Sequence, residues 1–215
     1  MKRFTEEMDD LVDSMVKMAK LATEMSNKSI SSFCKRDVDV ADDVINSFSI
    51  IRNYDMDIEK KAIRILTLYQ PAACDMRTIA TVLKCITYLE RIGKYSKNIA
   101  DATHYLKDKP AFEPESAISD MGTTVVKMVS LVTEGFIKSS VDGFDGIVDM
   151  DDHLDATMRE NMTKVIDFIV AHPESAHVCT YYISIMKYIE RMGDHACKMA
   201  EKVTFMVTGM HTEIK

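Results

Sequence analysis

The chain has 215 residues, of which 47% are hydrophobic and 28% charged, and its formal net charge is −7. This hydrophobic fraction is enough for a real core, and 7 Gly, 4 Pro and 17 Met favour a helical protein, because unbranched Met packs flexibly between helices. No Lys/Arg-rich run supplies the basic patch of a nucleic-acid-binding protein, and no apolar stretch approaches the ~18 residues of a membrane span.

The cellular compartment is indicated by the N-terminus and the cysteines. The first residues turn acidic directly after Phe4 and contain no apolar signal-peptide core. Five cysteines are scattered along the chain without a CxxC pair, which indicates free thiols in a reducing compartment. We therefore expect a cytoplasmic protein that neither crosses a membrane nor binds nucleic acid.

Apolar residues at helical spacing predict three helices in the first half, roughly over residues 5–26, 37–69 and 75–106. Pro71 ends the second helix, because the residue before a proline disfavours the α conformation. Two prolines and several charges follow in 107–114. We place a boundary there, between a first unit of residues 1–109 and a second of residues 110–215.

Three more helices are predicted in the second half. The fourth covers residues 115–141, the fifth follows a turn signal at 142–146 and ends at residue 171, and the sixth covers 174–208, with Gly209 as its C-cap. Apolar residues of the sixth helix recur at alternating steps of four and three from Val178 to Met206, the seam of a packed bundle. The expected fold class is all-α.

One phrase occurs twice, 100 residues apart. Residues 88–93 read Tyr-Leu-Glu-Arg-Ile-Gly, and residues 188–193 read Tyr-Ile-Glu-Arg-Met-Gly. An internal repeat of this length predicts one small bundle used twice, hence two tandem pseudo-symmetric three-helix bundles. Gly93 and Gly193 stand in the middle of predicted helices, where glycine costs about 1 kcal/mol relative to alanine, so we expect another helix or a ligand shell to approach closely.

Acidic residues form pairs spaced by four on two helices of the second half. Glu190 and Asp194 share a stripe with Cys197 and Glu201, and Asp151 and Asp155 form a second pair. Carboxylates at this spacing repel one another unless a cation lies between them, and oxygen-rich sites suit Mg²⁺, Mn²⁺ or iron. The alternative is a solvated acidic stripe without a ligand. Arg191, beside the acids, could hold a carboxylate in place.

The histidines give weaker signals. His104 and His177 each follow an acid by three residues, as in the Glu-x-x-His pairs of di-iron bundles, but both lie near predicted helix ends. His195, next to Asp194, is either a residue of the metal site or an exposed polar side chain.

The repeated phrase and its surroundings resemble the PhoU family of phosphate-uptake regulators. The resemblance rests on residues 190–196 (Glu-Arg-Met-Gly-Asp-His-Ala), on residues 98–100 (Asn-Ile-Ala) and on the corner at 69–77 (Tyr-Gln-Pro-Ala-Ala-Cys-Asp-Met-Arg), and it covers nearly the whole chain. It implies two three-helix repeats and metal ions, iron, Mg, Mn or Zn, held by acid-x3-acid motifs. Carried over by position, the ligands are Asp151, Asp155, Glu190 and Asp194.

The resemblance also implies a role and partners. The role is that of a cytoplasmic regulator, expected as a homo-oligomer such as a homodimer, that acts on the ATPase subunit of a phosphate ABC transporter and on a phosphate-sensing histidine kinase. The sequence contains no nucleophile elbow and no P-loop, so we expect no enzyme. The alternatives are a carboxylate-bridged metal hydrolase or oxidase, and a metal-free helical adaptor.

The first repeat departs from the family pattern. Lys94 stands at the position of Asp194, and Phe48 and Arg52 stand where the second helix should carry acids, while Glu90 remains. We therefore expect the second repeat alone to bind metal. In the first repeat, Lys94 and Arg52 are predicted to form an internal ion pair or triad with Glu90; the alternative is that Lys94 simply points to solvent.

Overall fold

The computed structural model describes residues 2–109 and 115–214, and these form six α-helices, one short 3₁₀-helix and no strand. The helices are α1 (Lys2–Lys35), α2 (Val38–Tyr69), α3 (Ala73–Leu106), α4 (Glu115–Lys138), α5 (Asp145–Ala171) and α6 (Ala176–Thr208), with η1 (Pro173–Ser175) before α6. The all-α prediction is confirmed. None of the helices described is long and apolar enough to cross a membrane.

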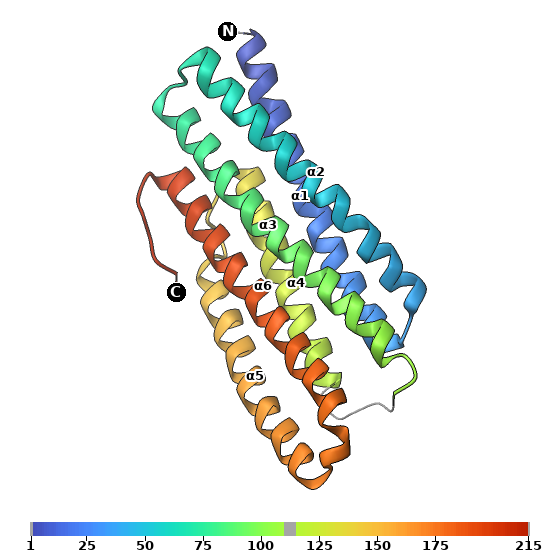
Figure 1. Ribbon diagram of the computed structural model, residues 1–215. Helices are drawn as coiled ribbons and strands as arrows, with labels where there is room; N and C mark the ends of the chain where they lie inside the picture. The colour runs from blue at the N-terminus through green and yellow to red at the C-terminus, as the bar shows by residue number, and fades with distance from the viewer. Residues whose placement is uncertain (1, 110–114, 215) are drawn as a thin grey trace.

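The helices form two bundles that lie side by side (Figure 1). The first contains α1, α2 and α3, and the second contains α4, α5 and α6. The bundles join through α3 against α6 and through α1 against α4. One hydrophobic core therefore runs through both bundles.

Burial follows the internal repeat closely. All ten buried residues of α4 lie 103 positions after a buried residue of α1, and α5 follows α2 at the same offset. For α3 and α6 the offset is 100. Three buried residues of α5 and α6 break the rule, because their counterparts are not buried: Asp151, Cys197 and Glu201. The offset of 103 makes Asp151 the counterpart of Phe48 and Asp155 the counterpart of Arg52 in the other repeat, as expected from the sequence.

The first helix is longer than predicted, since it continues past Ser26 to Lys35. Serines usually favour helix ends because their hydroxyls compete for backbone groups. Here the hydroxyls of Ser26, Ser29 and Ser32 donate to helix carbonyls three or four residues earlier. Ser26 also pairs with Ser96 of α3 at 3.1 Å. These serines therefore face α3 within the core and do not end the helix.

Of two other predicted helix ends, that of the fourth helix is wrong and that of the sixth is confirmed. The fourth helix ends at Lys138 instead of residue 141, because Ser139 adopts a left-handed conformation (φ 48°) and the Ser140 N–H donates to Gly135 O. Gly209 is the C-cap of α6, as predicted, with φ 75° and its N–H donating to Phe205 O. The proposed boundary between the units falls partly on residues 110–114, which lie outside the described residues, and stays a prediction.

Candidate metal centre

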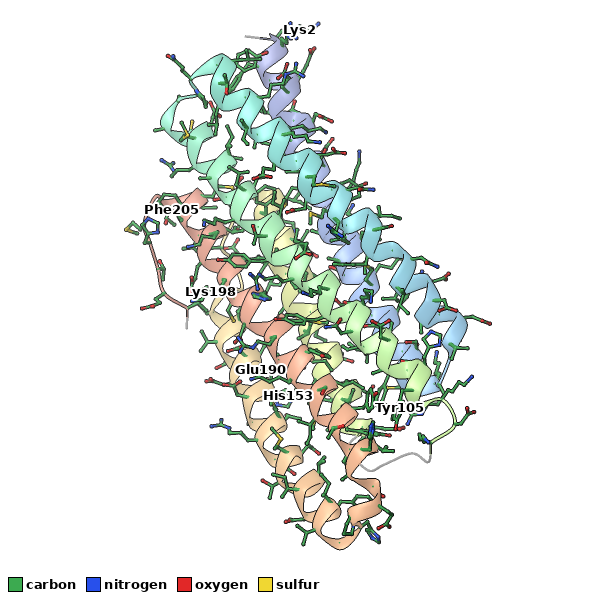
Figure 2. All side chains as sticks on the ribbon, in the orientation of Figure 1. Lys2, Tyr105, His153, Glu190, Lys198 and Phe205 are labelled. Carbon is green, nitrogen blue, oxygen red and sulfur yellow. The ribbon has the colours of Figure 1, made fainter. Side chains whose placement is uncertain are left out.

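The acidic residues predicted to bind metal come from two packed helices, α5 and α6 (Figure 2). Gly193 makes the close approach possible: a Cβ atom at this position would lie 2.6 Å from Leu154 Cδ1 and 3.2 Å from Asp151 Oδ1. The first repeat uses the same contact, since a Cβ at Gly93 would lie 3.3 Å from the side chain of Ile51. The expected close approach at both glycines is confirmed.

The four predicted ligands share one electrostatic environment. Asp151 is 2% exposed, whereas the side chain of Asp194 is 40% exposed. Burial raises the pKa of Asp194, and the carboxylates of Glu190, Asp151 and Asp155 raise it further, against an opposing effect of Arg191. Each of these acids therefore makes it harder to ionise Asp194. The acids of α5 are thus near enough to act on Asp194 of α6, and the role of the four residues as metal ligands stays a prediction.

Basic side chains hold Glu190 and Asp194 from one side. Lys187 Nζ donates to Glu190 Oε1 at 3.0 Å, and Arg191 lies 4.0 Å from Glu190 Oε2 and 3.8 Å from Asp194 Oδ2. Arg191 thus contacts both carboxylates, as its position suggested. Glu190 Oε2 is buried and accepts no hydrogen bond from the residues that the structure describes.

These observations show how far the cluster fits a cation. Carboxylate oxygens are the ligands that hard and borderline cations prefer, and none of the described residues donates a hydrogen bond to the buried Glu190 Oε2. Within residues 2–109 and 115–214, however, no three His, Cys, Asp or Glu side chains converge tightly enough to hold an ion as they stand. The residue types and their proximity fit a metal, and an ion would have to draw the side chains together.

The other candidate residues have structural partners elsewhere. His195 stacks on Tyr88 and Tyr95 of α3, with ring centroids 5.6 and 5.9 Å away. Burial, with Arg91 and Arg191, lowers the pKa of His195 to about 4. His104 Nε2 lies 2.9 Å from Asp42, and His177 Nδ1 lies 2.9 Å from the hydroxyl of Tyr105. These contacts give His104 and His177 partners outside the acidic cluster, whereas the buried Nε2 of His195, next to Asp194, has no hydrogen-bond partner among the described residues.

The equivalent place in the first repeat has different chemistry. Arg52, Asp55, Thr87 and Glu90 line a cavity of about 270 Å³. Among the described residues, Arg52, Glu90 and Lys94 form no ion pair with one another within 4 Å. The predicted internal ion pair is therefore wrong. Arg52 and Lys94 are exposed, so water solvates their charges and no buried partner is required.

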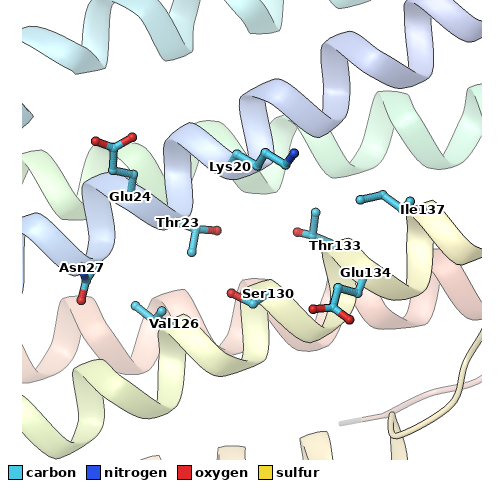
Figure 3. Close-up of a pocket in the computed structure, with 9 residues that line it drawn as sticks. All are labelled: Lys20, Thr23, Glu24, Asn27, Val126, Ser130, Thr133, Glu134 and Ile137. Carbon is cyan, nitrogen blue, oxygen red and sulfur yellow. The ribbon is translucent and has the colours of Figure 1, made fainter.

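A cavity of about 450 Å³ lies between α1 and α4, away from the acidic residues of α5 and α6 (Figure 3). Polar residues such as Thr23, Asn27 and Ser130 line it. Its two acids, Glu24 and Glu134, pair with lysines one turn away, at 2.8 and 3.0 Å. Its size does not make it the functional centre, because it gathers no group with unusual chemistry.

Comparisons with known proteins agree with the fold and the repeat. A family model described as the PhoU domain matches residues 15–103 and again 118–203. The chain belongs to the PhoU family. The "Phosphate-specific transport system accessory protein PhoU homolog 1" of Thermotoga maritima is 32% identical over 207 residues, which are 96% of this chain and 89% of that protein. A PhoU homolog of Clostridium acetobutylicum is 24% identical over 99% of this chain and 98% of its own length.

Solved structures show the same PhoU fold. The crystal structure of PhoU from Pseudomonas aeruginosa superposes with a TM-score of 0.93, at 24% identity, over 96% of this chain and all of that one. The "phosphate transport system regulatory protein PhoU" of Streptococcus pneumoniae gives a TM-score of 0.89, at 23% identity, over 97% of this chain and 99% of that one. At these identities the likeness shows the fold alone.

Proposed function

We propose that this protein is a cytoplasmic regulator of phosphate uptake. It acts by contact with the ATPase subunit of a phosphate ABC transporter and with a phosphate-sensing histidine kinase. The observation that carries the proposal is the match of both repeats to the PhoU domain, together with relatives named as accessory proteins of phosphate-specific transport. A homodimer is part of the proposal, and light scattering of the purified chain tests it.

The proposed centre lies in the second repeat. Asp151 and Asp155 of α5, with Glu190 and Asp194 of α6, would hold one or more ions of iron, Mg, Mn or Zn. An ion would add to the positive charge that Lys187 and Arg191 supply beside the four carboxylates, and it would tie α5 to α6 near Gly193. The support is the raised pKa of Asp194 and the buried Glu190 Oε2, to which no residue in the described part of the chain donates a hydrogen bond.

The regulatory role is tested in the cell from which the gene comes. Deleting the gene should change the rate of phosphate uptake at high external phosphate, and the wild-type gene should restore it. Purified protein should also bind the purified ATPase subunit in a titration. Unchanged uptake in the deletion strain, together with no binding at micromolar concentrations, would contradict the proposal.

The enzyme alternative is tested separately. Metal-loaded protein should hydrolyse a generic phosphoester, and oxidise Fe²⁺ with oxygen, no faster than the same concentration of free ion. Turnover that the Asp194→Ala variant loses would instead support a carboxylate-bridged hydrolase or oxidase. Full regulation of uptake by a chain that binds no metal would support the metal-free adaptor.

A further inference from the structure

Four aromatic rings stack along the contact between α3 and α6, which lie side by side on the face of the molecule toward the viewer in Figure 1. Tyr88 stacks on His195, His195 on Tyr95, and Tyr95 on Tyr188, with ring centroids 5.6, 5.9 and 5.6 Å apart. The internal repeat relates the first and the last of these contacts, at its offset of 100. We call the strip of α3 and α6 along these rings, residues 84–98 and 184–198, the ring seam.

The tyrosine hydroxyls of the ring seam reach solvent. Tyr88, Tyr95 and Tyr188 are half-buried, and their hydroxyls have no hydrogen-bond partner among the described residues. In the same part of the chain, the buried side-chain atoms that lack a partner belong to Asp151, Glu190 and His195 alone. The three hydroxyls are therefore not buried, and each is free to donate to a ligand outside the bundle.

The charge of the ring seam is opposite to that of the whole chain. Residues 84–98 contain four Lys or Arg and one acid, and residues 184–198 contain three Lys or Arg and two acids, which together give a net charge of +4. The whole chain carries −7, so the remaining residues carry −11. His195 adds no charge at neutral pH, because burial, with Arg91 and Arg191, lowers its pKa to about 4. The seam is thus a positive strip on an acidic protein.

The cations on the α3 side of the seam are not neutralised within the described chain. Lys84, Arg91 and Lys94 are exposed, and they form no ion pair with the residues that the structure describes. Glu90, the single acid of this segment, lines the cavity beside α2 together with Arg52. Three cations beside the ring stack are therefore available to an anionic ligand.

The spacing of these cations indicates an elongated ligand. Lys84 and Lys94 are ten residues apart on α3, which is about 15 Å along the helix axis. A single small anion cannot contact both, whereas about five residues of extended peptide cover this length. A flat anionic membrane would also meet Asp194, whose side chain is 40% exposed beside the seam. The same seam of a second copy would bring like charges together, which opposes binding.

We infer that the ring seam binds an acidic, extended segment of a partner protein. Its carboxylates pair with Lys84, Arg91 and Lys94, and the tyrosine hydroxyls donate to its carboxylates or backbone carbonyls. Charge complementarity of this kind supplies specificity and a faster encounter. The inference rests on the proposed function, since it names one surface for contact with a protein partner.

The test measures the fluorescence anisotropy of two labelled, capped peptides titrated with the full chain: the acidic DEDLEDE and its uncharged counterpart NQNLQNQ. At about 50 mM salt the acidic peptide should bind with a Kd below about 0.1 mM, and the uncharged peptide at least about tenfold more weakly. Raising the salt to about 0.5 M should weaken binding of the acidic peptide at least about tenfold, because salt screens exposed charges.

Matched variants locate the binding site. Lys84→Glu with Arg91→Glu reverses two charges on the seam and should weaken binding of the acidic peptide at least about tenfold. Lys17→Glu with Lys127→Glu makes the same change of charge at exposed residues of α1 and α4, and should weaken it by no more than about twofold. Circular dichroism and urea unfolding report the fold. If the charge reversal disturbs it, Lys84→Gln with Arg91→Gln replaces that variant, with an expected loss of at least about threefold.

Three results would overturn the inference. They are no binding of the acidic peptide at ~1 mM, equal binding by the uncharged peptide, and equal binding by a seam variant that keeps its fold. Binding of the chain to vesicles with anionic lipid, lost in the seam variant, would assign the seam to a membrane if the acidic peptide did not bind. None of these results affects the uptake experiment above, so failure here is distinct from failure of the regulatory role.

Discussion

The two repeats have the same helix contacts, but the charged residues beside those contacts differ. In both, a mid-helix glycine meets a large aliphatic side chain, Ile51 opposite Gly93 and Leu154 opposite Gly193. Around that contact the second repeat carries four acids, whereas the first carries Phe48, Arg52, Glu90 and Lys94. The first repeat therefore shows that the bundle forms without the acidic cluster.

This comparison indicates that the acids of the second repeat are not needed to pack the helices. Burial raises the pKa of Asp194, and the neighbouring carboxylates raise it further, because like charges close together oppose ionisation. The first repeat forms the same helix contacts with fewer acids and two cations. A ligand of opposite charge would offset this repulsion together with Lys187 and Arg191, and this is the reason for the proposed metal site.

The largest expected effect is transfer of the site. Phe48→Asp, Arg52→Asp and Lys94→Asp together would give the first repeat the four-acid set, with Glu90 as the fourth. This variant should bind at least one more ion than wild type, as measured by elemental analysis. The ion should stabilise it by about 2.7 kcal/mol when present at 100 times its Kd.

Lys20→Asp with Lys60→Asp is the control for the transfer, because it makes acidic changes at exposed residues away from the α2–α3 contact. It should bind no additional ion. A transferred set that keeps its fold and gains no ion at saturating Mg²⁺, Mn²⁺ or Fe²⁺ would show that the charges alone do not make the difference.

A smaller effect is expected at the glycines. Gly193→Ala should destabilise the fold by about 1–3 kcal/mol, because the new methyl overlaps Leu154 Cδ1 and presses on Asp151. Gly93→Ala should change the free energy of unfolding by less than about 1 kcal/mol, since its contact with Ile51 is looser and alanine favours the helix. Urea unfolding of both variants measures the difference, and equal costs would contradict the tighter approach in the second repeat.

The smallest effect is expected at Lys94. Its side chain is exposed, so Lys94→Ala should alter stability by no more than about 0.5 kcal/mol and leave the metal content unchanged. A cost of several kcal/mol, found by the same urea titration, would restore the idea of an internal ion pair in the first repeat.

Much of the fold could be predicted from the sequence, because periodic apolar residues and two prolines mark most helices directly. The end of α1 could not, since Ser26, Ser29 and Ser32 look like helix-ending residues until α3 covers them. The acid pairs could be predicted from their spacing of four residues, and the burial offset makes Phe48 and Arg52 the counterparts of Asp151 and Asp155. The missing Glu90–Lys94 pair depends on side-chain directions at the helix contacts, which the spacing of residues does not reveal.

The central claim is that the second repeat, and not the first, holds metal through its acids. Elemental analysis of wild type, Asp194→Ala and Lys94→Ala, all purified without chelator, tests it most directly. The account predicts at least one ion per chain in wild type and Lys94→Ala, and loss of most of it in Asp194→Ala. The same metal content in wild type and Asp194→Ala would contradict it.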